Sequence, residues 1–273
     1  AQQKLSELNA QTVWGKGKLQ EAALEARKHG ASIVITDREL TPGQARNIEN
    51  LLDCPLMDRS ELILDIFAQR ASSASGRLQV ELAQLRYRMP RLVGRGESLS
   101  RQGGGIGTRG PGESQLEKDR RLIAKRIQKL KKDIDQLGKH RARLRKKRSK
   151  MPQIALVGYT NAGKSSLMNA LCDLGEKKKV LSENNLFATL DPTTRHLRLP
   201  QDPGPPKELL ITDTVGFIRE LPKSLLEAFR ATIEDTLEAD LLLLIVDLSN
   251  PDWQNQLQTV HNLLDSLGAQ STR

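Results

Sequence analysis

The chain has 273 residues and a formal net charge of +10, from 43 Lys and Arg against 33 Asp and Glu. This length allows about two domains, each with its own core. The two cysteines, Cys54 and Cys172, form no CxxC pair, which argues against a disulfide framework and a zinc site. We expect a reducing compartment, the cytoplasm or an organelle of bacterial origin. The longest apolar run, 241–246, is far shorter than the roughly 20 residues that cross a bilayer.

Residues 1–58 alternate helix-like and strand-like patterns. An apolar segment at 31–36 lies between helix-like stretches at 19–29 and 42–52, which predicts a small α/β subdomain. The Gly-Lys-Gly-Lys run at 15–18 lacks the spacing of a nucleotide-binding loop. We interpret it as a turn before the first helix.

Residues 59–150 carry two helical stripes. Apolar residues recur in steps of four and three within 59–92, which predicts one amphipathic helix of about thirty residues. A second stripe at 123–144 follows a seven-residue repeat, which favours paired helices. Because neither helix can bury its stripe alone, we predict an antiparallel hairpin, roughly 45 Å long at 1.5 Å per residue.

The basic charge is concentrated in the second of these helices. Residues 117–150 hold sixteen Lys and Arg and four acidic residues, a net +12, so the rest of the chain sums to about −2. Solvated helix faces usually mix both signs. A basic excess confined to one segment instead favours a polyanion partner, because each neutralised phosphate releases counterions.

A glycine-rich segment lies between the two helices, and we place the hairpin tip at about 93–114. Residues 101–114 contain six glycines in fourteen positions. One interpretation is a flexible linker. The other is a loop whose bare amides, with Arg101 and Arg109, fit closely against RNA.

Residues 158–165, GYTNAGKS, match the phosphate-binding pattern G-x-x-x-x-G-K-[ST]. A predicted strand at 154–157 precedes them and a predicted helix at 166–172 follows, as the pattern requires. In such a loop the glycines allow the turn and backbone amides hold phosphate oxygens, while Lys164 reaches the β- and γ-phosphates and Ser165 ligates Mg²⁺.

Two further segments extend this site. A predicted strand at 208–212 ends in Asp213-Thr-Val-Gly216, where the aspartate can hold the magnesium shell and the glycine amide can sense the γ-phosphate. Residues 187–195, FATLDPTTR, lie between the two motifs and are interpreted as the first switch. A threonine hydroxyl there would complete the Mg²⁺ shell.

Residues 151–273 therefore predict an α/β domain with a mainly parallel sheet, which continues with a buried strand at 241–247 and a helix at 253–267. Guanine is usually selected by an Asn-Lys-x-Asp motif, and this sequence contains none. On motifs alone, ATP and GTP both remain open.

The series of motifs resembles the HflX family of ribosome-associated GTPases over nearly the whole chain. The segments that carry the resemblance are DRELTPGQARNIE, DRSELILDIFAQRA, LQVELAQLRY, SRQGGGIGTRGPGES, GYTNAGKS, FATLDPTTR and DTVGFIRELP. The resemblance implies an α/β subdomain with a long antiparallel helical hairpin, followed by a Ras-like GTPase domain. It also implies a factor, expected to be monomeric, that binds the large ribosomal subunit and its RNA. Bacterial members split ribosomes under stress, and their glycine-rich loop reaches toward the peptidyl-transferase centre.

The resemblance also implies the residues of the site, with GTP as substrate and Mg²⁺ as cofactor. Ser165 and Thr189 would hold Mg²⁺, and Thr193 and Thr194 are alternatives to Thr189 as the second ligand. The expected catalytic residues are Lys164, Asp213, Gly216 and Asn161. The expected nucleotide contacts are Gly158, Tyr159, Thr160, Asn161, Ala162, Gly163, Lys164, Ser165, Phe187, Ala188, Thr189, Leu190, Asp191, Asp213, Thr214, Val215 and Gly216.

Two positions bear on the mechanism. Phe217 stands where Ras-like enzymes use a glutamine to orient water, so we predict slow hydrolysis until the ribosome completes the site. Asn161 either helps to bind K⁺ beside the phosphates or merely tolerates the backbone shape of the loop.

Three functions stay open at this point. The first is a ribosome-splitting GTPase, and the second is a GTPase that assembles the large subunit. The third is an RNA-binding protein whose nucleotide domain is only structural.

Overall fold

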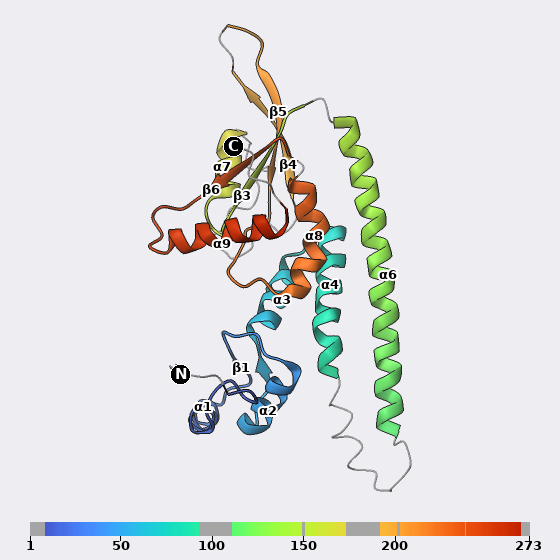
Figure 1. The fold of residues 1–273 in the computed structure, drawn as a ribbon, viewed down its shortest axis with the longest axis vertical. Helices are drawn as coiled ribbons and strands as arrows, with labels where there is room; N and C mark the ends of the chain where they lie inside the picture. Colours follow the sequence, from blue (N-terminus) through green and yellow to red (C-terminus); the bar gives the residue numbers. More distant parts are fainter. Residues whose placement is uncertain are drawn as a thin grey trace. The chain divides into compact units, whose positions relative to one another are not determined.

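The computed structural model describes residues 9–92, 111–148, 151–172, 192–200, 203–237 and 239–268. Two compact units are present: Ala1–Asp65 with Gln84–Ile123 form the first unit, and Ile66–Ala83 with Ala124–Arg273 form the second unit. Within the described ranges, no helix is long and apolar enough to cross a membrane. The helices and strands (Figure 1) are α1 (Lys16–Lys28), β1 (Val34–Ile35), α2 (Pro42–Leu52), β2 (Leu56–Met57), α3 (Arg59–Arg70), α4 (Ala74–Arg88), the 3₁₀ helix η1 (Met89–Leu92), α6 (Pro111–Arg148), β3 (Gln153–Gly158), α7 (Lys164–Leu171), β4 (Thr193–Leu199), β5 (Lys207–Asp213), α8 (Lys223–Leu237), β6 (Leu241–Ile245) and α9 (Trp253–Ser266).

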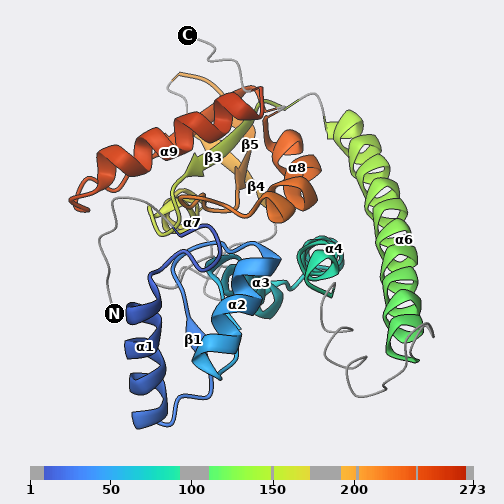
Figure 2. The ribbon, with the colours of Figure 1, turned by 60° about the horizontal axis from the view of Figure 1, so that its bottom comes forward.

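The first unit contains the predicted α/β subdomain. Its strands β1 and β2 pair in parallel, with α1 and α2 beside them (Figure 2). A capping box starts α2, because the Thr41 hydroxyl accepts from the Gln44 amide and the Gln44 side chain accepts from the Thr41 amide. The strand predicted over 31–36 is shorter, only Val34–Ile35. The core of the subdomain consists of Val13, Leu19, Leu40, Ile48 and Leu52.

A buried carboxylate connects the start of α3 to η1 within the first unit. Asp58 is 3% exposed, and its Oδ1 caps α3 by accepting from the Glu61 amide at 2.9 Å. Its Oδ2 accepts from the Leu40 amide and from Nη2 of Arg91, each at 3.0 Å. The Arg91 guanidinium also lies 3.5 Å from the ring centroid of Tyr87. Because a buried charge is tolerated only when paired, this cluster holds η1 on the subdomain.

The prediction of a single helix over 59–92 is wrong, because the first helix ends at Arg70 and the segment forms α3, α4 and η1 instead. The Ser73 hydroxyl accepts from the Gly76 amide at 2.9 Å, as an N-cap residue does. The Arg77 side chain donates to the Ser72 carbonyl. Serine side chains compete with helical backbone bonds, so the Ala-Ser-Ser run at 71–73 ends one helix and starts the next.

The long helix α6 buries its apolar stripe and exposes its basic residues. Ile127, Leu130 and Ile134 are buried. Arg126 forms a bidentate pair with Glu81 of α4, both bonds at 2.7 Å. The helix starts at Pro111, earlier than the predicted loop end at 114, because proline suits the first turn of a helix. The exposed basic residues are Lys118, Arg120, Arg121, Lys125, Arg126, Lys129, Lys131, Lys132, Lys139 and Arg143.

The second unit is built on a four-stranded sheet of order β4-β5-β3-β6. Strand β3 pairs in parallel with β5 and β6, whereas β4 runs antiparallel to β5, so the sheet is mainly parallel as predicted. Met168 of α7 packs with Leu156 and Ile211 of the sheet. The strand predicted as buried at 241–247 lies at the edge of the described sheet, and Leu241 and Leu243 are 53% and 38% exposed.

Candidate nucleotide-binding site

The loop at 158–165 connects β3 to α7 at the carboxyl end of the parallel strands. Gly158 has φ +154°, and a Cβ there would collide with the Ile245 carbonyl of β6. Gly163 is the N-cap residue of α7 and has φ +93°. Both glycines therefore adopt backbone conformations that favour glycine, and they let the loop turn at the N-terminus of α7, where an anion can bind.

Lys164 points back into the loop. Its ammonium donates to the carbonyls of Gly158 at 3.2 Å and Tyr159 at 2.8 Å, and the residue is only 5% exposed. Burial lowers the pKa of Lys164 to about 8, although the nearby Asp213 carboxylate acts in the opposite direction. A phosphate at the loop would restore the preference for the charged form.

Asp213 and Ser165 lie together, although 48 positions separate them in the sequence. The Ser165 hydroxyl donates to Oδ2 of Asp213 at 2.5 Å, and Asp213 is fully buried at the end of β5. The Thr214 hydroxyl donates to the Leu156 carbonyl at 2.6 Å, which anchors the segment to β3. A hydroxyl and a carboxylate are hard oxygen ligands of the kind that Mg²⁺ prefers, so this donor set fits that ion.

The backbone after Asp213 packs directly on the loop. Phe217 donates its amide to the Gly158 carbonyl at 3.1 Å and accepts from the Thr160 amide at 2.7 Å. A Cβ on Gly216 would lie 2.6 Å from Cα of Thr160 and 3.1 Å from Nζ of Lys164. Gly216 is therefore close enough to Lys164 for both to contact one phosphate oxygen.

One contact here was not predicted from the motifs. The Tyr159 hydroxyl accepts from the Arg219 amide at 3.2 Å, so the second residue of the loop also holds the segment beyond Gly216. The motif allows any residue at position 159, so only the hydroxyl of the tyrosine could have indicated this contact.

Some of the remaining predicted residues are described by the structure and others are not. Asn161 has φ +61°, a left-handed conformation that asparagine tolerates, so the backbone alone gives a reason for this residue. Thr193 and Thr194 lie in β4, where the Thr194 hydroxyl is 3.0 Å from that of Thr212. The switch residues Phe187, Ala188, Thr189, Leu190 and Asp191 lie outside the described residues.

A glycine loop between a parallel strand and a helix, facing a buried aspartate at the end of the next strand, defines a P-loop nucleotide-binding domain. Three family profiles match the chain, described as GTP-binding GTPase N-terminal (residues 1–68), GTP-binding GTPase Middle Region (70–148) and 50S ribosome-binding GTPase (153–272). The chain belongs to the HflX family of GTPases.

Two curated relatives agree with this assignment. GTPase HflX of Caldanaerobacter subterraneus is 51% identical, over 99% of this chain and 62% of that protein. GTPase HflX of Escherichia coli K12 is 46% identical, over 93% of this chain and 58% of that protein. The chain thus spans about three fifths of the length of these curated relatives. A GTP-binding protein from Sulfolobus solfataricus, solved with GDP, is 24% identical with a TM-score of 0.45, covering 97% of this chain and 68% of that one.

Proposed function

We propose that the protein is a GTPase of the cytoplasm that binds the large ribosomal subunit and splits ribosomes, with affinity governed by the bound nucleotide. The observation that carries the proposal is the phosphate loop, with Lys164 and the Ser165 to Asp213 pair at its centre. The matching family profile, described as a 50S ribosome-binding GTPase, supports the partner.

Within this proposal the residues of the loop bind and orient the triphosphate. Lys164 would neutralise the β- and γ-phosphates, and the Gly216 amide would meet the γ-phosphate. Ser165 and Asp213 would hold Mg²⁺, joined by Thr189 of the first switch. The ion would supply charge for the phosphate oxygens as the leaving group departs. K⁺ beside Asn161 remains a proposal that equal turnover in KCl and NaCl would reject.

The ring of Phe217 cannot orient a water by hydrogen bonding, and it is 3% exposed. We therefore expect slow hydrolysis by the free protein. The ribosome would supply the group that orients the attacking water. The basic residues exposed along α6, including Lys129 and Lys132, offer a surface for ribosomal RNA. Of the proposed hairpin tip at about 93–114, residues 93–110 lie outside the described residues.

Ribosome splitting requires that GTP favour a conformation with higher affinity for the free large subunit than for the joined ribosome. We expect the full-length protein to separate subunits in sucrose gradients with a GTP analogue and not with GDP. Lys164→Ala should abolish both nucleotide binding and separation. Equal separation with GDP would reject the switch. Binding only to immature particles would favour an assembly factor, and an unchanged Lys164→Ala variant would leave the nucleotide domain purely structural.

The lowered pKa of Lys164 predicts that nucleotide binding takes up a proton. The free chain has a pKa of about 8 here, below the ordinary 10.5, so Lys164 loses its charge as pH rises past 8. Bound phosphates favour the charged form, so affinity should fall by about tenfold per pH unit above pH 8. The free energy of unfolding of the nucleotide-free chain should instead rise with pH between about 8 and 10.5. Over this interval Lys164 keeps its proton in the unfolded chain but has lost it in the folded chain.

Calorimetry of GDP binding at pH 8.5, without metal and in buffers of different ionisation enthalpy, measures this proton uptake. The control is Lys164→Arg, which keeps its charge throughout. Uptake that is equal in both proteins would contradict the assignment to Lys164.

A further inference from the structure

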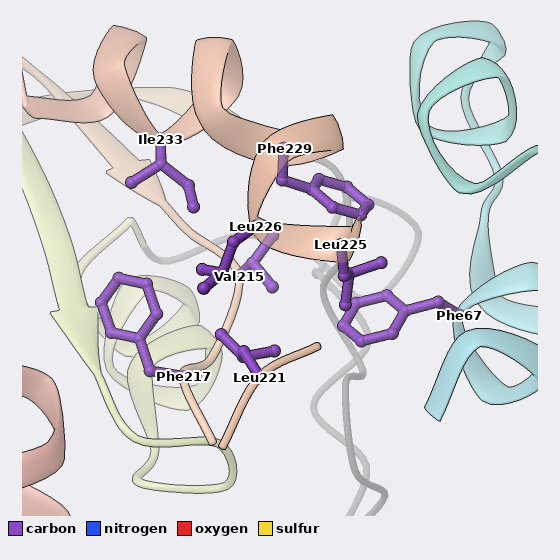
Figure 3. A pocket seen from close by; sticks show the side chains of 8 residues that line it. All are labelled: Phe67, Val215, Phe217, Leu221, Leu225, Leu226, Phe229 and Ile233. Atoms are coloured by element: carbon purple, nitrogen blue, oxygen red, sulfur yellow. The ribbon is translucent and has the colours of Figure 1, made fainter. Parts of the chain in front are cut away.

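An apolar pocket lies within the second unit and is lined in part by residues of the segment after β5, 214–221, which we call the switch segment. Figure 3 shows its lining, with Val215, Phe217 and Leu221 from the switch segment and Leu225 and Phe229 from α8. A further side chain, Phe67, comes from the last turn of α3 and points into the same pocket. Two distant parts of the sequence, Phe67 of α3 and residues 215–233, therefore meet in one pocket.

Phe67 is tightly held there. It is 1% exposed, and its ring centroid lies 5.7 Å from that of Phe229 with the planes tilted by 43°. This spacing and tilt are favourable for aromatic pairs. Leu225 and Phe229 are 2% and 4% exposed, so the side chains around Phe67 are themselves buried.

Phe217 contacts both the phosphate loop and the pocket. Its backbone amide and carbonyl bond to the phosphate loop, while its ring enters the pocket with Phe67. A shift of Gly216 and Phe217 along the loop must therefore move the Phe217 ring, and the buried side chains that line the pocket with it then have to repack.

We propose that Phe67 is a positioning residue for the nucleotide switch. Its ring packs on Phe229 and lines the same pocket as Val215 and Phe217, and so stabilises the conformation in which Gly216 lies beside Lys164. Since Gly216 and Lys164 can then share one oxygen of a third phosphate, the packed conformation favours GTP over GDP. The inference rests on the proposed function, because it assumes that both nucleotides bind at the loop.

Through Phe67, the position of α3 is coupled to the nucleotide state. Three residues after Phe67 the helix ends, and the Ser-capped turn at 71–73 leads into α4. Glu81 of α4 is in turn paired with Arg126 of the basic helix. By reciprocity, whatever fixes these helices on a partner also biases the switch through Phe67.

The test is the affinity of the full-length protein for GDP and for a non-hydrolysable GTP analogue, with Phe67→Ala. We expect the analogue to bind at least about fivefold more weakly, the lower end of typical coupling between sites, and GDP to bind as in wild type. Phe67→Met, which refills the apolar volume, should restore most of the preference. Leu130→Ala, a buried position of α6 away from the pocket, is the control for lost stability alone.

Each outcome is decisive. If wild type binds neither nucleotide, the proposed function fails before this inference is reached. If both bind and Phe67→Ala leaves their affinity ratio unchanged, or weakens both equally as Leu130→Ala does, Phe67 is only a core residue. If Phe67→Ala does not fold, Phe229→Leu, which removes the ring partner of Phe67, decides instead: it should lower the preference for the analogue, and an unchanged affinity ratio would reject the inference.

Discussion

Arg91→Ala is expected to destabilise the first unit by about 3 kcal/mol, at the lower end of the cost of breaking a buried ion pair. The substitution leaves the carboxylate of Asp58 buried without its cation, although the amides of Leu40 and Glu61 still donate to it. Burial and the same carboxylate also raise the pKa of Tyr87 far above its ordinary value, as expected where negative charge is poorly solvated.

Urea denaturation followed by tryptophan fluorescence measures this loss. Trp14 packs against the core of the first unit, so a Trp253→Phe background leaves a reporter for that unit alone. The control is Arg27→Ala, whose pair with Asp53 is exposed and should change stability by no more than about 0.5 kcal/mol. A double-mutant cycle with Asp58→Asn should show coupling, and additive losses would place the cost elsewhere.

The phosphate-loop domain was predictable because its residues obey local rules. A strand, a loop of fixed spacing and a helix occur in one stretch of sequence, so the positions of Gly158, Gly163 and Lys164 follow from the motif. The partnership of Ser165 with Asp213 was also predictable, because parallel strands end at the same edge of a sheet.

Features that depend on distant contacts were not predictable. The break in the stripe over 59–92 is an exception, because it comes from local serine bonds at 71–73 that helical periodicity does not reveal. The role of Asp58 depends on Arg91, 33 positions away, and that of Phe67 on Phe229. Periodicity reports which face of a helix is buried, but it does not say what the buried face meets.

Gly216→Ala is expected to lower the rate of GTP hydrolysis by about a hundredfold, the usual cost of losing one preorganised transition-state donor. The added Cβ would lie 2.6 Å from Cα of Thr160, and backbone atoms cannot rotate away as a flexible side chain can. The switch segment must therefore lift from the loop and give up the bonds of Phe217 to Gly158 and Thr160. Because the loop amides and Lys164 remain in place, GDP should bind with an affinity within about threefold of wild type.

Gly138→Ala is the matched control for this substitution. Gly138 lies within α6 and a Cβ there would meet nothing within 4 Å, so hydrolysis should be unchanged. Stability should rise by about 0.5–1 kcal/mol, because alanine loses less backbone freedom in a helix. Single-turnover hydrolysis with saturating GTP separates the chemical step from binding. A Gly216→Ala variant that hydrolyses GTP at the wild-type rate would show that the close approach of Gly216 to Thr160 and Lys164 is not the conformation in which the reaction occurs.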